Sequence, residues 1–252
     1  MLKKQLKNLS VICVLAATSS VAMAHLNIAK ENAMSIGEGS REYKEGSSAF
    51  LNVNISHDCT NEEGKHFATS GIELLLPNGE SVMGGITKSH GGDVYGANAV
   101  MGIKQRMNHT FRSVRVKKGA VSPYYSHGEK TEDVRLLSWM KGNVDNDHYD
   151  NLEFKTSFPK IDEASCVAKI KMYFPSVQYC RKGYKIAWIG TPDSVWGEGD
   201  AKTRVTDRYA ASLSVVRTTE LPAECVEGET VEAKPSVDEI NKYLGRHFGH
   251  NH

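Results

Sequence analysis

Short stretches in which apolar and polar residues alternate restrict the fold of this chain more than any other feature of its sequence. "AFLNVNIS" at residues 49–56 and "FRSVRVKKG" at 111–119 alternate as half-buried strands do. The same pattern recurs at 133–142, 152–158, 167–174, 185–190 and 211–217, and "GIELLLP" at 71–77 is a further strand candidate that ends in a turn. Turn-forming Gly, Pro, Asn and Asp residues separate these segments, and no helix of normal length is evident among them. Many short strands joined by turns predict an all-β sandwich or barrel.

Two regions depart from this pattern. Residues 79–109 are rich in glycine and less periodic, so we expect a long loop there with one short strand. After Arg217 the chain becomes polar and acidic, which is typical of a linker. Ser236 and Glu239 then form an S-x-x-E capping box before "INKYLGRHF". We therefore predict a short C-terminal helix, followed by a tail that ends in "HFGHNH".

The first 24 residues have the three parts of a secretory signal peptide. Three lysines precede the apolar run Leu9–Ala17, and Ala22 and Ala24 are the small residues before a cleavage site. The run is too short for a membrane span, which needs about 20 residues, and no later segment is long and apolar enough. We expect cleavage after Ala24, export to the periplasm or outside, and no stable membrane insertion of the mature protein.

The charge balance argues against a nucleic-acid partner. The chain has 31 basic and 30 acidic residues, and loss of the three signal-peptide lysines leaves 28 basic residues against 30 acidic ones. A protein that binds the phosphate backbone needs a basic excess. Polybasic attraction to a membrane surface is equally unsupported.

Four cysteines remain after cleavage: Cys59, Cys166, Cys180 and Cys225. An even number of cysteines in an exported chain predicts disulfides. Their spacing is wide and contains no C-x-x-C, which argues against a zinc cluster or a thioredoxin-like motif. Four cysteines allow three pairings, and their positions alone do not choose among them.

Cleavage after Ala24 makes His25 the first residue of the mature chain. Its α-amine and its imidazole Nδ1 then belong to one residue and can close a chelate ring around a metal ion. Nitrogen ligands of this kind suit Cu(II), which prefers tetragonal N,O environments and has the highest affinity among the common divalent ions. The sequence therefore points to a Cu(II) ligand at the mature N terminus.

Several motifs together resemble the YcnI-like copper-binding domain family. "KMYFPSVQYCRKGYKIAWIGTPDS" (171–194) is similar to the family pattern Y-F-P-x-x-Q-x-[YC]-x-x-G-x-x-x-x-W and the G-P-P-D-S-like turn after it. "AHLNIAK" resembles the A-H-V-T-V start, "HDC" (57–59) resembles H-G-C, and "IELLLPNG" (72–79) resembles V-E-V-x-I-P-x-G. "SPYYSHG" through "LLSW" (122–139) and "DNDHYDNLEF" match the middle of longer members. The resemblance covers nearly all of residues 25–217.

The resemblance implies an immunoglobulin-like β-sandwich that binds Cu(II). The family's ligand histidine corresponds to His25, its early-strand glutamate to Glu73, and its tryptophan near the metal to Trp188. It also implies disulfides Cys59–Cys180 and Cys166–Cys225, since the H-x-C and Q-x-C positions co-occur in longer relatives. Two departures concern partner interactions: residues 37–46, "GEGSREYKEG", resemble an insertion beside the site, and a histidine-bearing tail replaces the membrane anchor of many relatives.

Each site residue also has a plainer interpretation. Glu73 can also be interpreted as a solvent-facing strand residue between the core residues Ile72 and Leu74. In that case Glu62 or Glu63 is the alternative ligand. Trp188 is also explained as a core aromatic. We expect a structural role for His57. The histidines of the tail, His247, His250 and His252, form either a weak secondary metal site or a solvated end.

Together these features predict three regions: a signal peptide at 1–24, a YcnI-like sandwich at 25–217, and an acidic linker with a histidine-containing tail at 218–252. The expected function is Cu(II) binding in copper trafficking or homeostasis, without enzymatic activity, with another copper-trafficking protein as a candidate partner. Two alternatives remain. One is a copper oxygenase of the polysaccharide monooxygenase type, which needs a second histidine ligand. The other is a metal-free structural or adhesin-like sandwich.

Overall fold

The structure is a computed structural model, and it describes most of the chain after residue 41. The described residues are 27–29, 42–79, 86–90, 93–192, 195–196, 199–206, 209–245 and 249–250. The predicted signal peptide, His25, Asp193 and Ser194 lie outside them. Among the described residues, no helix is both long and apolar enough to cross a membrane.

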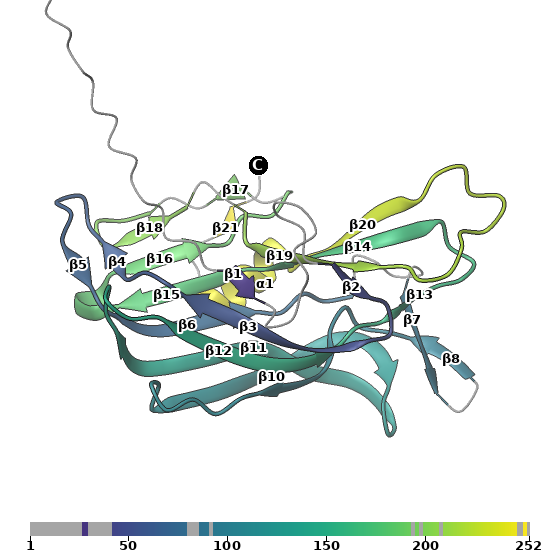
Figure 1. Cartoon of the computed structure of the whole chain (residues 1–252), viewed down its shortest axis with the longest axis horizontal. Helices are drawn as coiled ribbons and strands as arrows, with labels where there is room; N and C mark the ends of the chain where they lie inside the picture. Colours follow the sequence, from purple (N-terminus) through teal and green to yellow (C-terminus); the bar gives the residue numbers. More distant parts are fainter. Residues whose placement is uncertain are drawn as a thin grey trace, which may run out of the picture.

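A six-stranded sheet forms one layer of the molecule (Figure 1). Its strands, in spatial order, are β10 (Ser113–Tyr125), β11 (Glu129–Val144), β6 (Thr69–Leu75), β15 (Ser176–Cys180), β16 (Lys185–Trp188) and β18 (Thr203–Val205). All neighbours are antiparallel except β16 and β18. The edge strand β10 accommodates Pro123, which has no N–H to donate to a ladder.

A four-stranded antiparallel sheet forms the facing layer. Its strands, in spatial order, are β1 (Asn27–Ala29), β3 (Ser48–Ile55), β12 (Asp150–Ser157) and β9 (Met101–Gln105). A second four-stranded sheet extends this architecture and consists of β2 (Glu42–Lys44), β19 (Ala211–Val216), β14 (Val167–Phe174) and β20 (Glu229–Ala233). β14 runs through Pro175 directly into β15, so one stretch of chain joins two sheets.

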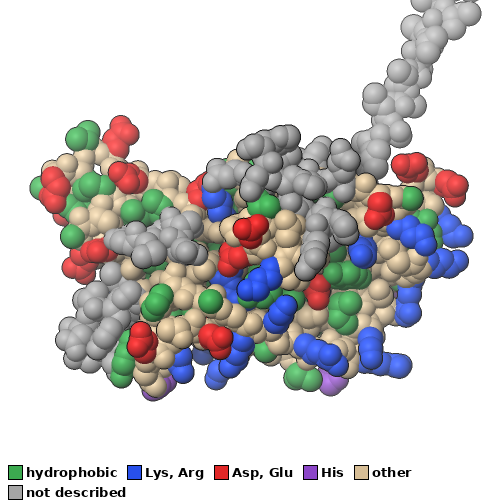
Figure 2. Space-filling view, turned by 180° about the vertical axis from the view of Figure 1, so that it is seen from behind, with side chains coloured by type: hydrophobic (Ala, Val, Ile, Leu, Met, Phe, Trp, Pro, Cys, Tyr) green, Lys and Arg blue, Asp and Glu red, His purple; other side chains and the backbone are tan. Residues whose placement is uncertain are grey.

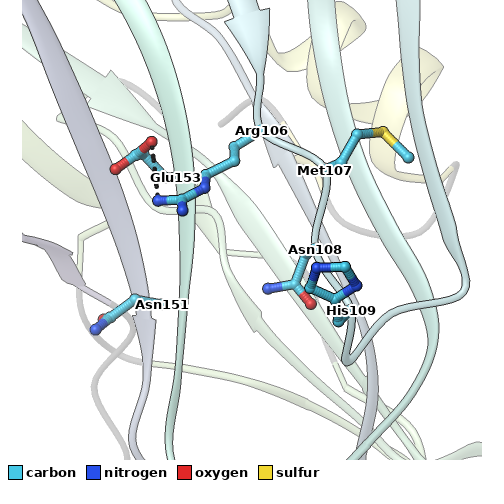
Figure 3. A pocket seen from close by; sticks show the side chains of 6 residues that line it. All are labelled: Arg106, Met107, Asn108, His109, Asn151 and Glu153. Atoms are coloured by element: carbon cyan, nitrogen blue, oxygen red, sulfur yellow. Dashed lines mark ion pairs between the residues drawn. The ribbon is translucent and has the colours of Figure 1, made fainter.

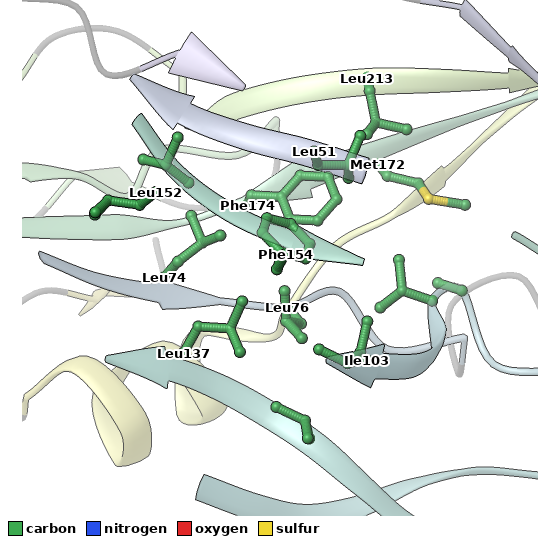
Figure 4. Packing of buried hydrophobic residues seen from close by; sticks show 14 of the residues in the cluster. Leu51, Leu74, Leu76, Ile103, Leu137, Leu152, Phe154, Met172, Phe174 and Leu213 are labelled. Carbon is green, nitrogen blue, oxygen red and sulfur yellow. The ribbon is translucent and has the colours of Figure 1, made fainter. Parts of the chain in front are cut away.

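The core fills the space between the facing layers (Figure 4). Leu51 and Leu152 come from β3 and β12, Leu74 and Leu137 come from β6 and β11, and all four are less than 1% exposed. The side chains of Phe154 and Phe174 lie among them in Figure 4. Alternation along each strand sends every second residue into this core. The predicted all-β, immunoglobulin-like sandwich with a short C-terminal helix is confirmed.

The glycine-rich region contains more regular structure than expected. Residues 79–109 include β7 (Ile86–His90), β8 (Asp93–Gly96) and β9. β7 and β8 form a hairpin that also pairs with β13 (Lys160–Ile161). β9 completes the four-stranded sheet through β12. These strands are short, so their sequences show too few alternations to be recognised, and both β7 and β9 pair with strands far along the chain.

Smaller elements complete the chain. β4 (Cys59–Thr60) pairs with β5 (His66–Phe67), and β17 (Val195–Trp196) pairs with β21 (Gly249–His250). A 3₁₀ turn, η2 (Arg181–Gly183), connects β15 to β16. Part of the expected insertion is also regular, because residues 42–44 form β2, which pairs in parallel with β19.

The segment predicted to be an acidic linker contributes to the fold. β20 pairs in parallel with β14 at the edge of its sheet, because Val231 and Ala233 pack against buried neighbours. The predicted helix is confirmed as α1 (Val237–Leu244), with Ser236 as N-cap and the full capping box with Glu239. α1 packs its apolar face on the outer side of the six-stranded sheet, against Leu75, Leu136, Val177 and Ala187.

Both disulfides implied by the resemblance are confirmed. Cys59 is bonded to Cys180, which ties the segment after β3 to the end of β15. Cys166 is bonded to Cys225, which ties the start of β14 to the acidic segment.

On the face shown in Figure 2, basic side chains occur in several separate groups, with neutral and acidic surface between them.

Candidate functional site

The strand that follows His25 has a defined place in the sandwich, although His25 itself lies outside the described residues. β1 pairs antiparallel with β3 from Asn27 opposite Asn54 to Ala29 opposite Asn52. Because the two strands are antiparallel, the first described residue of β1, Asn27, lies near the end of β3. The motif "HDC" at 57–59 follows that end, and it is the motif that resembles H-G-C of the family.

Two contacts show how the layers are superimposed. Gln105 of β9 donates from Nε2 to the carbonyl oxygen of Ser138 in β11 at 3.1 Å. Gln178 of β15 donates from Nε2 to the carbonyl oxygen of His57, just after β3, at 2.8 Å. The order β9-β12-β3-β1 therefore runs over β11-β6-β15-β16, and β1 lies on the β16 side of the sandwich.

Trp188 projects from β16 into the space between the layers. It is 3% exposed and belongs to the main core cluster. Its direct partner across the ladder is Ser176 of β15, which is fully buried. Within the described part of the chain, Trp188 Nε1 and Ser176 Oγ are both buried without a hydrogen-bond partner. Two adjacent unsatisfied polar groups are costly and mark a place where a polar partner belongs.

Glu73 lies on the other face of the same sheet. Its carboxylate accepts a hydrogen bond from the Tyr179 hydroxyl at 2.7 Å and one from Ser138 Oγ at 3.4 Å. Burial raises the pKa of the Tyr179 phenol, and the hydrogen bond and charge of Glu73 raise it further. Val177, directly opposite Glu73 in the ladder, packs under α1. Glu73 therefore faces the helix side and not the layer that contains β1.

The structure thus does not bring Glu73 and Trp188 together. Val177 pairs with Glu73 on one side and with Ala187 on the other, so these three residues share one face. Trp188 follows Ala187 and projects from the opposite face, because side chains alternate along a strand. A ligand at the start of β1 can lie beside Trp188, while Glu73 is separated from it by the sheet.

The other expected residues lie apart from one another. Glu62 and Glu63, the alternative ligands, are exposed in the turn between β4 and β5. The carbonyl oxygen of His57 accepts the bond from Gln178, which fits a structural role, and its side chain is exposed. His247 and His252 lie outside the described residues, and His250 is placed only by the backbone pairing of β21. In the described ranges, no three His, Cys, Asp or Glu side chains are grouped as metal ligands are.

The residues near β1 therefore fit a copper site only in part. The donor set expected for Cu(II) begins with the amine and imidazole of His25, and one orphaned indole N–H and one orphaned hydroxyl lie on the face towards β1. These groups suit hydrogen bonding to a ligand or a bound solvent molecule. The carboxylate assigned by the resemblance is already engaged by Tyr179 on the opposite face.

A polar hollow that the sequence did not indicate lies at the end of β9 (Figure 3). Its volume is about 310 Å³, and it is lined by Arg106, Met107, Asn108, His109, Asn151 and Glu153. Four of these residues are consecutive and belong to the region expected to be a loop, so only the tertiary structure brings them beside β12. The M-x-H spacing of Met107 and His109 was visible in the sequence, but their exposure was not.

A search of curated proteins finds no significant match to the chain. Among solved structures, the chain is similar to one titled "Crystal structure of an uncharacterized protein from Nocardia farcinica reveals an immunoglobulin-like fold". The identity is 12%, the TM-score is 0.35, and the match covers 70% of this chain and 92% of that one. In a comparison with family models, residues 96–215, which include Trp188 but not His25 or Glu73, match the "Domain of unknown function (DUF1775)", which is the domain of the YcnI-like family.

Proposed function

We propose that this is an exported protein that holds Cu(II) through the α-amine and the imidazole Nδ1 of His25, in copper trafficking or homeostasis and without enzymatic turnover. Two disulfides support export, because such bonds persist in oxidising compartments such as the periplasm or the exterior. The match of residues 96–215 to the YcnI-like domain supports the family on which the copper expectation rests.

The position of β1 is the observation that carries the proposal. His25 precedes Asn27 by two residues, and a strand advances about 3.3 Å per residue. The pairing of β1 with β3 would therefore hold the new N terminus within about 7 Å of a fixed point in the sandwich. Anchoring of this kind reduces the entropy that a free chain end loses when it chelates a metal.

Trp188 and Ser176 provide the inner wall in this proposal. The indole covers the core side of the ion, limits water access, and leaves its N–H to donate to a group at the site. Ser176 Oγ can accept or donate beside it. Cu(II) is the cargo in this scheme, and these side chains orient the histidine and exclude solvent around it.

Glu73 is not part of the proposed ligand set. Its bond to Tyr179 and its position on the helix face give it a structural role in the six-stranded sheet. The remaining coordination positions are left to solvent or to a second copper-trafficking protein that accepts the ion. An exposed, incomplete site is suited to exchange because an incoming ligand can bind before the ion leaves.

Electron paramagnetic resonance of the mature protein loaded with one equivalent of Cu(II) tests the proposal. The control carries one additional residue before His25, which converts the amine into an amide while it leaves the fold unchanged. We expect a single nitrogen-coordinated spectrum from the mature protein and its loss or replacement in the control. Identical spectra would place copper elsewhere. Incubation with ascorbate and polysaccharide distinguishes the oxygenase alternative, which predicts oxidised sugar products.

A further inference from the structure

The polar hollow at the end of β9 contains two side chains that have no structural task. Met107 is 75% exposed, and His109 is exposed beside it. Within the described ranges, neither side chain takes part in a hydrogen bond or an ion pair. A large apolar side chain at this exposure gains little from packing, so the fold does not explain why methionine stands here.

The residue between them is held firmly. Asn108 accepts hydrogen bonds on Oδ1 from the N–H groups of Thr110 at 2.7 Å and Phe111 at 3.2 Å. Its Nδ2 donates to Asp150 of β12 at 3.2 Å. Phe111 is 1% exposed and packs over Gly142, where any side chain would collide with its ring. Met107 and His109 therefore extend from a rigid turn, and only Asn108 lies between them in the sequence.

The charges around the hollow partly cancel. Arg106 lies 3.4 Å from the Glu153 carboxylate, and Asp150 lies on the far side of Asn108. Figure 3 shows Arg106 turned towards Glu153, while Met107 and His109 lie on the other side of the hollow. After Arg106, the nearest cations along the chain are Lys104 and Arg112, and both are exposed. A singly charged ion meets less repulsion in this setting than a divalent ion does.

We propose that Met107 Sδ and the His109 imidazole bind a soft monovalent metal ion, Cu(I), at the rim of this hollow. Thioether sulfur is a soft ligand that selects Cu(I), and imidazole also suits copper. Two residues separated by one position on a rigid turn can close a chelate by rotation of exposed side chains. No electron transfer is part of the proposal: the ion enters as Cu(I) and remains Cu(I).

This site does not depend on the N-terminal site. Each has its own donors and its own oxidation state of copper, and the two can be tested in one protein. Oxidation of Met107 to the sulfoxide removes the soft donor and should abolish binding.

The experiment uses the mature chain with one extra residue before His25, so that the amine chelate is absent. Anaerobic competition with a chromogenic Cu(I) chelator gives the affinity, and the methionine methyl resonances report which sulfur binds added Ag(I). We expect one monovalent site, a shift of the Met107 methyl signal, and at least a tenfold loss of affinity in Met107→Leu and in His109→Gln. His127→Asn alters an exposed histidine at a distant hairpin and should leave the affinity unchanged.

The proposal is overturned if this protein does not compete for Cu(I), or if Met107→Leu and His109→Gln retain the parent affinity. Failure of the N-terminal site gives a different result: the mature protein shows no nitrogen-coordinated Cu(II) spectrum, or the extra residue leaves that spectrum unchanged, while Cu(I) competition continues. Circular dichroism of the two variants confirms that they fold, because neither side chain is buried.

Discussion

Glu73 and Trp188 project from opposite faces of one six-stranded sheet, although the strands that carry them are separated only by β15. Glu73 is bound to Tyr179 on the side covered by α1, and Trp188 is buried on the side that faces the four-stranded sheet. The resemblance to the copper family had placed both residues at one site. Because they are separated, substitutions of Glu73 and Trp188 should affect Cu(II) binding differently.

Glu73→Gln should leave Cu(II) affinity and the paramagnetic spectrum unchanged, because the carboxylate lies on the far face from β1. It should lower the free energy of unfolding by about 1–2 kcal/mol, since the Tyr179 hydroxyl loses a charged acceptor. Chemical denaturation and copper titration measure the two effects. Glu63→Gln, in an exposed turn, is the matched control. A changed copper spectrum in Glu73→Gln would restore the carboxylate to the ligand set.

Trp188→Phe should keep Cu(II) affinity within about a factor of ten, or ~1.4 kcal/mol, because the indole shields the site without supplying a ligand. Copper bound near an indole quenches its fluorescence, so titration of the parent should quench and the variant should lose most of that effect. Quenching that persists in Trp188→Phe would show that Trp139 or Trp196 is nearer the metal and that the site is misplaced.

His25→Ala in the mature chain should lose most Cu(II) affinity while the protein remains folded. The α-amine survives in this variant, but without the imidazole it cannot close the chelate ring. Isothermal titration measures the affinity, and thermal unfolding should shift little because the substitution is at the end of the mature chain. Copper binding as tight as that of the parent would disprove an N-terminal site.

Glu239→Gln should weaken the attachment of α1 to the sheet, although the Glu239 side chain is partly exposed. One oxygen of Glu239 binds Arg135 Nη2 at 2.7 Å, and the other accepts the N–H of Ser236 in the capping box. Arg135 is fully buried, so removal of its charged partner should cost about 2–4 kcal/mol of unfolding free energy. Denaturant unfolding measures this, with the exposed Glu227→Gln as control. Equal stability of the two variants would contradict a stabilising role for the Glu239–Arg135 ion pair.

Glu45 should contribute to acid sensitivity. Burial alone would raise the pKa of its carboxyl, but hydrogen bonds from Thr218 and Ile161 outweigh it and hold the pKa below the ordinary value. A depressed carboxyl pKa stabilises the fold above the unfolded-state pKa, and this stabilisation is lost as pH falls through the folded-state value. The stability of Glu45→Gln should therefore fall less steeply below about pH 4.5 than that of the parent. Parallel pH profiles of the two proteins would contradict this.

The local pattern of the sequence was sufficient for most of the fold. Alternation along 49–56 and 152–158 predicted strands because each carries one mainly buried face, and such a face is visible in a single segment. The capping box at Ser236 predicted α1 because its hydrogen bonds are local. The two disulfides followed from the family resemblance, since four cysteines alone allow three pairings.

Contacts between distant segments decided the rest. β7, β8, β9 and β20 are too short to show a period, and β7, β9 and β20 pair with strands far along the chain. The sequence placed Glu73 and Trp188 on strands, but which face each residue occupies relative to the other depends on the cross-strand register through Val177. A shift of that register by one residue would reverse the arrangement. Composition at the N terminus points to copper chemistry, while only the packing of one sheet on the other determines which side chains lie near that end of the chain.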